Sequence, residues 1–207
     1  MVQTVSASKI TLYDLEKRFR LQQIKDSSFF EEWQTDLPAI TKIEQQRLER
    51  IEAAVENLER RSVRENTVKL AVLAPLIDLS GLFLPPFYVS TEESVNIEAT
   101  DDDFVVQGRI DILVLKEALW LLVIESKRTT FSPQVGIPQL LSYMLAAPQE
   151  HPVYGLVTNG RDFVFLKLAF DEVPRYGKSR QFVLGQDQDL AQVLKIMKHL
   201  AERLGQV

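Results

Sequence analysis

Two stretches decide the fold of this chain: Gly108-Arg109-Ile110-Asp111-Ile112-Leu113-Val114-Leu115, and Trp120-Leu121-Leu122-Val123-Ile124-Glu125-Ser126-Lys127-Arg128. Both are short and strongly apolar, and a few turn-compatible residues, 116–119, separate them. Apolar runs of this length are typical of strands that are buried on both faces. The two stretches therefore predict a buried β-hairpin at the centre of the fold.

Three charged residues interrupt this apolar hairpin: Asp111 on one strand, and Glu125 and Lys127 on the other. Because side chains alternate along a strand, Glu125 and Lys127 point to one face, and Ser126 points away. Asp111 lies on the partner strand, where its carboxylate would meet the pair. Burying such groups is costly unless they are paired or bind a metal. The sequence thus leaves two readings, a structural ion pair at the strand end or a functional site.

Composition excludes several classes of site. The 207 residues include no cysteine and two histidines, which excludes thiolate zinc sites and cysteine nucleophiles and argues against a His-rich metal centre. The formal net charge of -5 argues against a protein that coats nucleic acid through bulk electrostatics. This net charge does not exclude a local basic groove beside an acidic metal site. The length suits one domain with an appendage.

Neither a secretion signal nor a membrane span is expected. The first nine residues lack a basic segment followed by an apolar one. No uninterrupted apolar run approaches the roughly 20 residues that span a bilayer. We therefore expect a soluble, cytoplasmic protein with no membrane partner.

Apolar periodicity divides the chain into an N-terminal helical arm, residues 1–62, and a core, residues 63–207. In the arm, the spacing predicts a helix over 12–21 and a longer helix from 37 to about 61. The narrow apolar stripe of the longer helix suits packing on the core or on a second copy of the chain. A homodimer through the N-terminal helices is therefore a candidate assembly. Between the two helices, three aromatic residues are assigned to packing: Phe29, Phe30 and Trp33.

In the core, helices and strands are expected to alternate. They are a helix over 65–82 with a kink or break at Pro75, a hairpin over 94–107, the central hairpin, a helix over 134–147, a strand-turn-strand unit over 153–168 and a helix over 190–200. This order predicts an α/β fold in which helices flank a central mixed β-sheet.

Two carboxylates that converge without His or Cys favour a hard cation with oxygen ligands, Mg²⁺ or Mn²⁺. The natural reaction of such a site is phosphodiester hydrolysis. Asp111 and Glu125 would hold the metal, and the backbone carbonyl of Ser126 is a candidate third ligand. Lys127 would orient the attacking water or stabilise the charge that develops on the phosphate.

At this point the residues resemble a known family. Asp111 followed by Glu125-Ser126-Lys127 is similar to the PD-(D/E)xK nuclease superfamily. Five elements in order resemble, more narrowly, the N-terminal nuclease domain of type I restriction enzyme R subunits: Glu65, Gly108 to Asp111, Val123 to Arg128, Gln139-x-x-x-Tyr143 and Gly155 to Gly160. The resemblance covers roughly residues 60 to 170. It implies a restriction-endonuclease-like core and a Mg²⁺-dependent endonuclease whose partner is DNA.

The resemblance also implies roles for further residues. Glu65 becomes a candidate outer metal ligand, although a helix-start acid favoured by the helix dipole is an equal alternative. Gln139 joins the catalytic set because it would project towards Lys127, and Gln139 and Tyr143 would contact DNA or steady the site. Tyr143 could equally be a core aromatic with a satisfied hydroxyl.

Two strand-end arginines complete the expected site. Arg109 and Arg128 are candidate phosphate contacts, with solvated strand-end arginines as the alternative.

The chain departs from the family pattern in two ways. Ile110 replaces the proline of the superfamily's name, at a position that carries no chemistry. No Gly-x-x-x-x-Gly-Lys-Ser/Thr motif is present, so we expect no nucleotide cofactor and no ATP-driven motor. Two hypotheses follow: a metal-dependent DNA endonuclease of restriction type, or a catalytically inactive nuclease-fold protein that binds DNA or acts as a scaffold through the helical arm.

Overall fold

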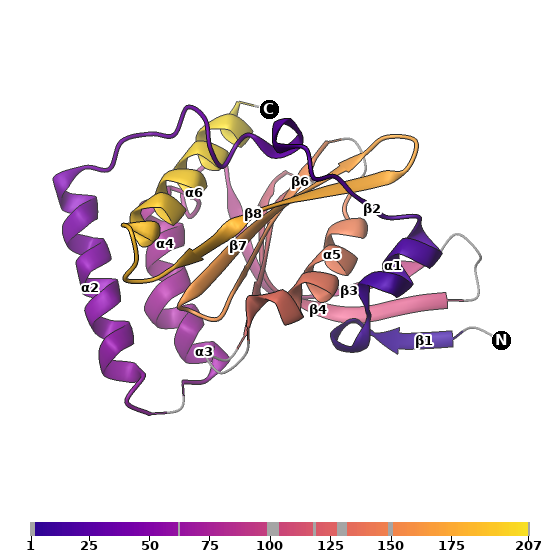
Figure 1. Cartoon of the computed structure of the whole chain (residues 1–207), viewed down its shortest axis with the longest axis horizontal. Coiled ribbons are helices and arrows are strands. Elements are labelled where there is room, and N and C mark those ends of the chain that lie inside the picture. Colours follow the sequence, from indigo (N-terminus) through magenta and orange to yellow (C-terminus); the bar gives the residue numbers. More distant parts are fainter. Residues whose placement is uncertain are drawn as a thin grey trace.

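The computed structural model describes residues 3–61, 63–98, 104–117, 119–127, 132–148 and 151–206. Within these residues, eight strands form one sheet (Figure 1). The strands are β1 (Gln3–Ser6), β2 (Gln22–Gln23), β3 (Tyr88–Glu98), β4 (Phe104–Lys116), β5 (Leu119–Ser126), β6 (Val153–Thr158), β7 (Asp162–Phe170) and β8 (Pro174–Val183).

Helices pack on both faces of this sheet. They are α1 (Leu12–Phe19), α2 (Lys42–Leu58), α3 (Glu65–Val68), α4 (Ala74–Leu79), α5 (Ile137–Leu145) and α6 (Asp189–Gly205). Shorter turns are η1 (Ala7–Lys9), η2 (Ser27–Phe30), the π turn η3 (Lys69–Leu73) and η4 (Pro133–Gly136). None of the described helices is long and apolar enough to cross a membrane.

The sheet is mixed, as expected. Its order is β1-β4-β5-β6-β7-β8-β2, and β3 pairs with β4 outside this path. The central hairpin, β4 with β5, is antiparallel, whereas β5 and β6 are parallel. Parallel neighbours need a crossover connection, and α5 supplies it between β5 and β6. The predicted α/β class, a mixed sheet flanked by helices, is confirmed.

Two apolar cores lie on opposite faces of the sheet. One face of the sheet packs against α2, α4 and α6, which stand on the left of Figure 1. The other face packs against η1, α1 and α5. On β5, Ile124 belongs to the first core and Val123 to the second, as alternation along a strand requires. The central hairpin is therefore buried on both faces, which matches its apolar sequence.

Regular alternation breaks on β4 at Asp111. Ile110 is buried in the core beneath α1 and α5, whereas Ile112 is buried in the core beneath α2, α4 and α6. Two residues apart on a regular strand would share one face. Opposite Asp111, Glu92 of β3 has a φ of 60°, in the left-handed region, and the pairing of β3 with β4 is interrupted there. This break lets the Asp111 side chain reach the end of β5, where it accepts hydrogen bonds.

A single helix runs from Glu65 to Leu79 through α3, η3 and α4. Within it, the N–H of Ala74 donates to the carbonyl of Lys69, five residues earlier. Proline has no N–H and crowds the preceding helical turn, and the wider π turn before Pro75 accommodates it. The irregularity predicted at Pro75 is therefore a π turn, and the helix continues through it.

The N-terminal residues are tied to the sheet in two places. β1 pairs in parallel with β4, and β2 pairs in parallel with β8. The aromatic rings of this segment pack on the core, Phe30 at 6.0 Å from Tyr154 and Trp33 at 5.9 Å from Phe182, between ring centroids. The packing role expected for these rings is confirmed. A domain boundary near residue 62 stays a prediction.

Two boundaries differ from those expected. The long helix of the arm begins at Lys42 and not near residue 37, because Thr41 and Glu44 form a capping box that fixes its first turn. Strand β3 begins at Tyr88, earlier than residue 94, because it pairs along most of β4. The helix start follows from a local pattern three residues apart, whereas the strand limit depends on a pairing partner that is distant in sequence.

Candidate active site

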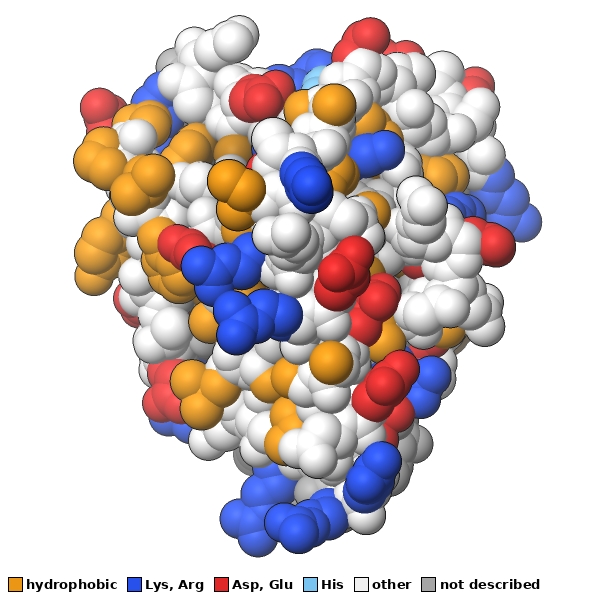
Figure 2. All heavy atoms as spheres, turned by 90° about the vertical axis from the view of Figure 1, so that its left-hand side faces the viewer, with side chains coloured by type: hydrophobic (Ala, Val, Ile, Leu, Met, Phe, Trp, Pro, Cys, Tyr) orange, Lys and Arg blue, Asp and Glu red, His pale blue; other side chains and the backbone are white. Residues whose placement is uncertain are grey.

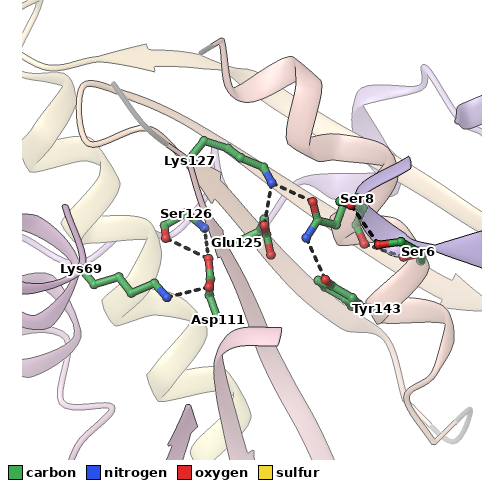
Figure 3. Close-up of polar contacts among 10 residues, drawn as sticks. Ser6, Ser8, Lys69, Asp111, Glu125, Ser126, Lys127 and Tyr143 are labelled. Carbon is green, nitrogen blue, oxygen red and sulfur yellow. Dashed lines mark hydrogen bonds and ion pairs between the residues drawn. The ribbon is translucent and has the colours of Figure 1, made fainter. Parts of the chain in front are cut away.

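Asp111 and Glu125 lie at the end of the central hairpin (Figure 3). The antiparallel pairing of β4 with β5 extends to Ile112 and Ile124, and the two carboxylates follow directly on the two strands. The Glu125 side chain is 4% exposed and that of Asp111 is 18% exposed. The hairpin thus brings two acids together at the rim of the core, where water is largely excluded.

Lys127 lies over Glu125 and is held from two sides (Figure 3). Its Nζ donates to Oε1 of Glu125 at 2.8 Å and to Oε1 of Gln139 at 2.7 Å. Its backbone N–H donates to the carbonyl of Thr158 at 2.7 Å, which fixes the residue after β5 against β6. The structure therefore brings together the strand-end pair and the glutamine of α5, as the sequence predicted.

Tyr143 supports Gln139 from one helical turn away. The Nε2 of Gln139 donates to the Tyr143 hydroxyl at 2.7 Å, and the backbone N–H of Arg109 also hydrogen-bonds this hydroxyl. Tyr143 is buried, and burial together with the charge of Glu125 raises its pKa to about 12. Its ring lies so close to Gly108 that a Cβ there would be 2.5 Å from Cε1. Tyr143 is thus a core aromatic with a satisfied hydroxyl that steadies the site from within.

One carboxylate oxygen of Glu125 has no partner in the described part of the chain. Oε1 accepts from Lys127, whereas Oε2 is buried without a hydrogen bond from any residue that the structure describes. Burial, the charge of Asp111 and, more weakly, that of Glu65 raise the pKa of Glu125 to about 7, against the lowering effect of Lys127. A buried oxygen without a donor is a position that attracts a proton or a cation.

Asp111 is bound on both of its oxygens. Oδ2 accepts from the backbone N–H and the hydroxyl of Ser126, each at 2.8 Å. Oδ1 pairs with Nζ of Lys69 at 2.6 Å. Asp111 was expected to meet Glu125 and Lys127, but its hydrogen bonds go to Ser126 and Lys69, because the break in β4 carries Asp111 across to the serine side of β5.

Lys69 is the functional candidate that the sequence reasoning missed. It lies on the π turn η3, 42 residues before Asp111, so no local pattern places it in the site. A signal did exist: Lys69 follows Glu65 by four residues, and residues at this spacing share one face of a helix. Once Glu65 is assigned to the site, Lys69 faces it too.

Two expected site residues are not gathered with the others, and the position of a third is not described. Glu65 starts α3 and acts on Glu125 through its charge, but the described residues contain no group of three acidic, His or Cys side chains that could hold a metal ion. The Arg109 guanidinium is exposed and lies 3.4 Å from Glu92. Arg128 lies outside the residues that the structure describes.

The donor set fits a hard divalent cation. Two adjacent carboxylates, one of them with a buried and unpaired oxygen, offer oxygen ligands only. Mg²⁺ is commonly bound by one or two carboxylates and completes its shell with water or substrate oxygens. A third protein carboxylate is therefore not required for this pair to hold a metal.

Comparison with known proteins gives one family. The family described as "Type I restriction enzyme R protein N terminus (HSDR_N)" matches residues 5–172 of this chain. No curated protein matches it.

Two solved structures resemble parts of the chain. One is described as "cryoEM structure DrdV-DNA complex", with a TM-score of 0.48 and 16% identity over 74% of this chain and 14% of that one. The other is a fragment of a putative HsdR subunit of a type I restriction enzyme from Vibrio vulnificus YJ016, with a TM-score of 0.41 and 15% identity over 70% of this chain and 26% of that one. The chain thus corresponds to a minor part of each of these longer proteins.

Proposed function

Because the chain belongs to the family of type I restriction enzyme R protein N termini, we propose that it is a metal-dependent DNA endonuclease that acts in the cytoplasm. The observation that carries the proposal is the geometry of Asp111, Glu125 and Lys127. Two carboxylates lie side by side, one of them has a buried free oxygen, and a lysine is fixed above them by two hydrogen bonds.

Asp111 and Glu125 would hold Mg²⁺ or Mn²⁺, and the backbone carbonyl of Ser126 is a further candidate ligand. Glu65, at the start of α3, is the candidate for an outer position. When bound, such an ion supplies a water of lowered pKa and polarises a phosphoryl oxygen.

The chain's own residues provide orientation and charge. Lys127 would direct the attacking water and stabilise negative charge on the phosphate, because its ammonium is held in a site from which water is largely excluded. Gln139 fixes Lys127, and Tyr143 fixes Gln139. Arg109 and Arg128 are proposed to contact phosphates of the DNA backbone.

Cleavage of supercoiled plasmid tests this proposal. Wild-type protein is expected to nick or linearise the plasmid with Mg²⁺ or Mn²⁺ and not with EDTA. Glu125→Gln and Lys127→Met are expected to lower the rate by at least about 10²-fold each, the usual effect of removing one charge-stabilising group. Lys198→Met, which breaks an ion pair with Glu44 outside the site, should leave the rate unchanged. Intact plasmid with both metals, at protein concentrations that bind DNA, would sink the proposal.

An exposed apolar surface supports a second candidate function, that of an interaction protein acting through the helical arm. Figure 2 shows apolar side chains gathered beside basic ones on the face where α2 lies. Ile43 of α2 is 71% exposed and Leu70 of η3 is 75% exposed. They line a hollow of about 670 Å³ between α2 and the helix that contains η3 and α4. The other residues of its lining are Arg47, Arg50, Ile51, Ala54, Ala71, Ala74, Pro75, Asp78 and Leu79.

The occupant that suits this hollow best is a second copy of the chain. Its walls carry charges of both signs, Arg47 and Arg50 from α2 and Asp78 from α4, so two copies related by a twofold axis can pair unlike charges. Light scattering across a concentration series is expected to show a dimer that Leu70→Glu dissociates. A wild-type chain that stays monomeric at high concentration would exclude this assembly.

A further inference from the structure

We propose that Lys69 is an exchangeable counter-ion, a cation of the chain itself that neutralises Asp111 until a divalent metal ion displaces it. The inference rests on the proposed function, which places a metal ion on Asp111. It adds a positioning residue to that site and predicts how tightly the metal is held.

The two oxygens of Asp111 are bound in different ways. Oδ2 accepts from two neutral donors of Ser126, which orient the carboxylate without removing its charge. Oδ1 pairs with the ammonium of Lys69 at 2.6 Å, which does remove it. The cation that neutralises Asp111 in this structure is therefore Lys69. Figure 3 shows this lysine approaching Asp111 from the side opposite to Lys127.

The two lysines of the site differ in how firmly they are held. Lys127 bonds to both Glu125 and Gln139, and its backbone is fixed to β6. Within the described part of the chain, the ammonium of Lys69 has one hydrogen-bond partner, Asp111. When a metal ion binds between the carboxylates, Lys127 therefore stays in place, whereas Lys69 can be displaced.

The side chain of Lys69 borders a hollow into which it can move. A hollow of about 260 Å³ lies beside Asp111, and Asn66, Lys69, Thr91 and Glu92 contribute to its walls. The Lys69 side chain is 20% exposed, so the ammonium can swing into this hollow and regain water there. Glu92, on the wall of this hollow, is exposed and lies 3.4 Å from Arg109, so hydration is the main compensation for the loss of Asp111.

The charges predict the sign of the effect on metal binding. Two carboxylates and two ammonium groups sum to no net charge, so a dication must either displace a lysine or bind beside it. Like charges a few ångströms apart repel more strongly near a protein surface than in bulk water, because the effective dielectric constant is lower there. Removing the Lys69 charge should therefore tighten metal binding, whereas a lysine with a merely structural role would leave affinity unchanged or weaken it.

Calorimetric titration of Mn²⁺ into the whole chain tests the proposal. Lys69→Met is expected to bind Mn²⁺ at least about tenfold more tightly than wild type. Lys69→Arg, which keeps the charge, should bind no more tightly than wild type. Lys198→Met is the matched control, because Lys198 forms an ion pair of similar length and exposure with Glu44. Lys69→Gln is the second neutral variant if Lys69→Met does not fold, with folding checked by circular dichroism.

The outcomes separate this inference from the proposed function. Tighter Mn²⁺ binding by the neutral variants supports the counter-ion role even if no chain cleaves plasmid. Neutral variants that fold and bind Mn²⁺ with wild-type or lower affinity would overturn it, although wild-type cleavage would still support the nuclease. Absence of Mn²⁺ binding in every chain would overturn both the counter-ion role and the metal site.

Discussion

Glu125 is the residue at which a proton would compete with the proposed metal ion. Its free oxygen is buried, and its pKa is raised to about 7 by burial and by the charge of Asp111. Near neutral pH the metal-free site therefore exchanges a proton readily. A divalent ion that binds to Glu125 must first displace that proton.

We predict that the stability of the metal-free protein falls as the pH rises towards 7. The pKa of Glu125 is about 7 in the folded chain, against 4.5 for an ordinary glutamate. The folded chain therefore binds more protons than the unfolded chain between these values, and its free energy of unfolding decreases with pH there. The loss amounts to at most about 3 kcal/mol and is complete above about pH 7.

Urea unfolding at pH 5 and pH 8, with EDTA present, measures this effect. Glu125→Gln removes the titrating group but keeps an oxygen for Lys127, so the variant should lose less stability than wild type over the same interval. Parallel pH profiles for the two chains would show that the Glu125 carboxyl is not perturbed.

Gln139 is predicted to act on the turnover rate through Lys127. Gln139→Ala removes one of the two partners of the ammonium, and a hydrogen bond to a charged group contributes about 1.5–3 kcal/mol. We expect plasmid cleavage to slow about tenfold or more, with DNA affinity unchanged. Gln45→Ala, on the exposed side of α2, is the control. Weaker DNA binding at an unchanged maximal rate would instead make Gln139 a DNA contact.

At the scale of single residues, the sequence predicted which side chains share a face of one strand or of one helix. Glu125 and Lys127 share a face because they are two apart, and Gln139 and Tyr143 stack because they are four apart. Lys69 was not predicted as a site residue, because its contact with Asp111 depends on how a helix packs on the sheet. The partners of Asp111 were predicted wrongly because one interrupted pair in β4 changes which side Asp111 faces.

Among the elements, long apolar strands and capped helices were predictable, and short pairings were not. The central hairpin and α5 have strong local patterns of apolar residues. By contrast, β1 and β2 are four and two residues long, and each pairs with a strand that lies far along the chain. Their stability comes from the partner strand and the core, so no local pattern distinguishes them from loop.

The N-terminal segment is predicted to depend on one buried ion pair. Glu32, which is almost fully buried, accepts from Lys167 of β7 at 2.6 Å and from the Tyr154 hydroxyl of β6 at 2.8 Å. Breaking a buried pair by removing one partner costs about 3–5 kcal/mol. Lys167→Leu should therefore lower the free energy of unfolding by roughly that amount, as measured in urea.

A double variant isolates the pair itself. Glu32→Leu combined with Lys167→Leu leaves no unpaired buried charge, because Arg203, which lies 3.7 Å from Glu32, is exposed, and the double variant should be more stable than Lys167→Leu alone. Burial alone would raise the pKa of Glu32, but the hydrogen bonds from Lys167 and Tyr154 lower it. The contribution of the pair should therefore be complete above pH 4.5 and be lost as the pH falls through the lowered pKa. Additive losses in the double variant would contradict this coupling.

On the scale of the whole molecule, charge opposes the proposed substrate. The chain has a formal net charge of -5, and two of its carboxylates lie in the site that a phosphate would enter. A negative protein repels the DNA backbone over about a Debye length, near 10 Å at 0.1 M salt. Lys69 and Lys127 at most neutralise these carboxylates, so the proposed cleavage needs a bound cation to make the site attractive to phosphate.

We therefore predict that divalent cations control DNA binding as well as cleavage. With EDTA at pH 8, where Glu125 is ionised, wild type should bind a short duplex weakly, and the divalent cation Ca²⁺ should tighten binding by about tenfold or more. Glu125→Gln should bind more tightly than wild type in EDTA, because it removes a repelling charge, and should gain less from Ca²⁺. Glu49→Gln changes the net charge equally on an exposed position of α2 and should do neither. Fluorescence anisotropy measures all six affinities, those of three chains in EDTA and in Ca²⁺. An equal response of the two variants would show that net charge, and not the carboxylates of the hairpin, controls access of DNA to the site.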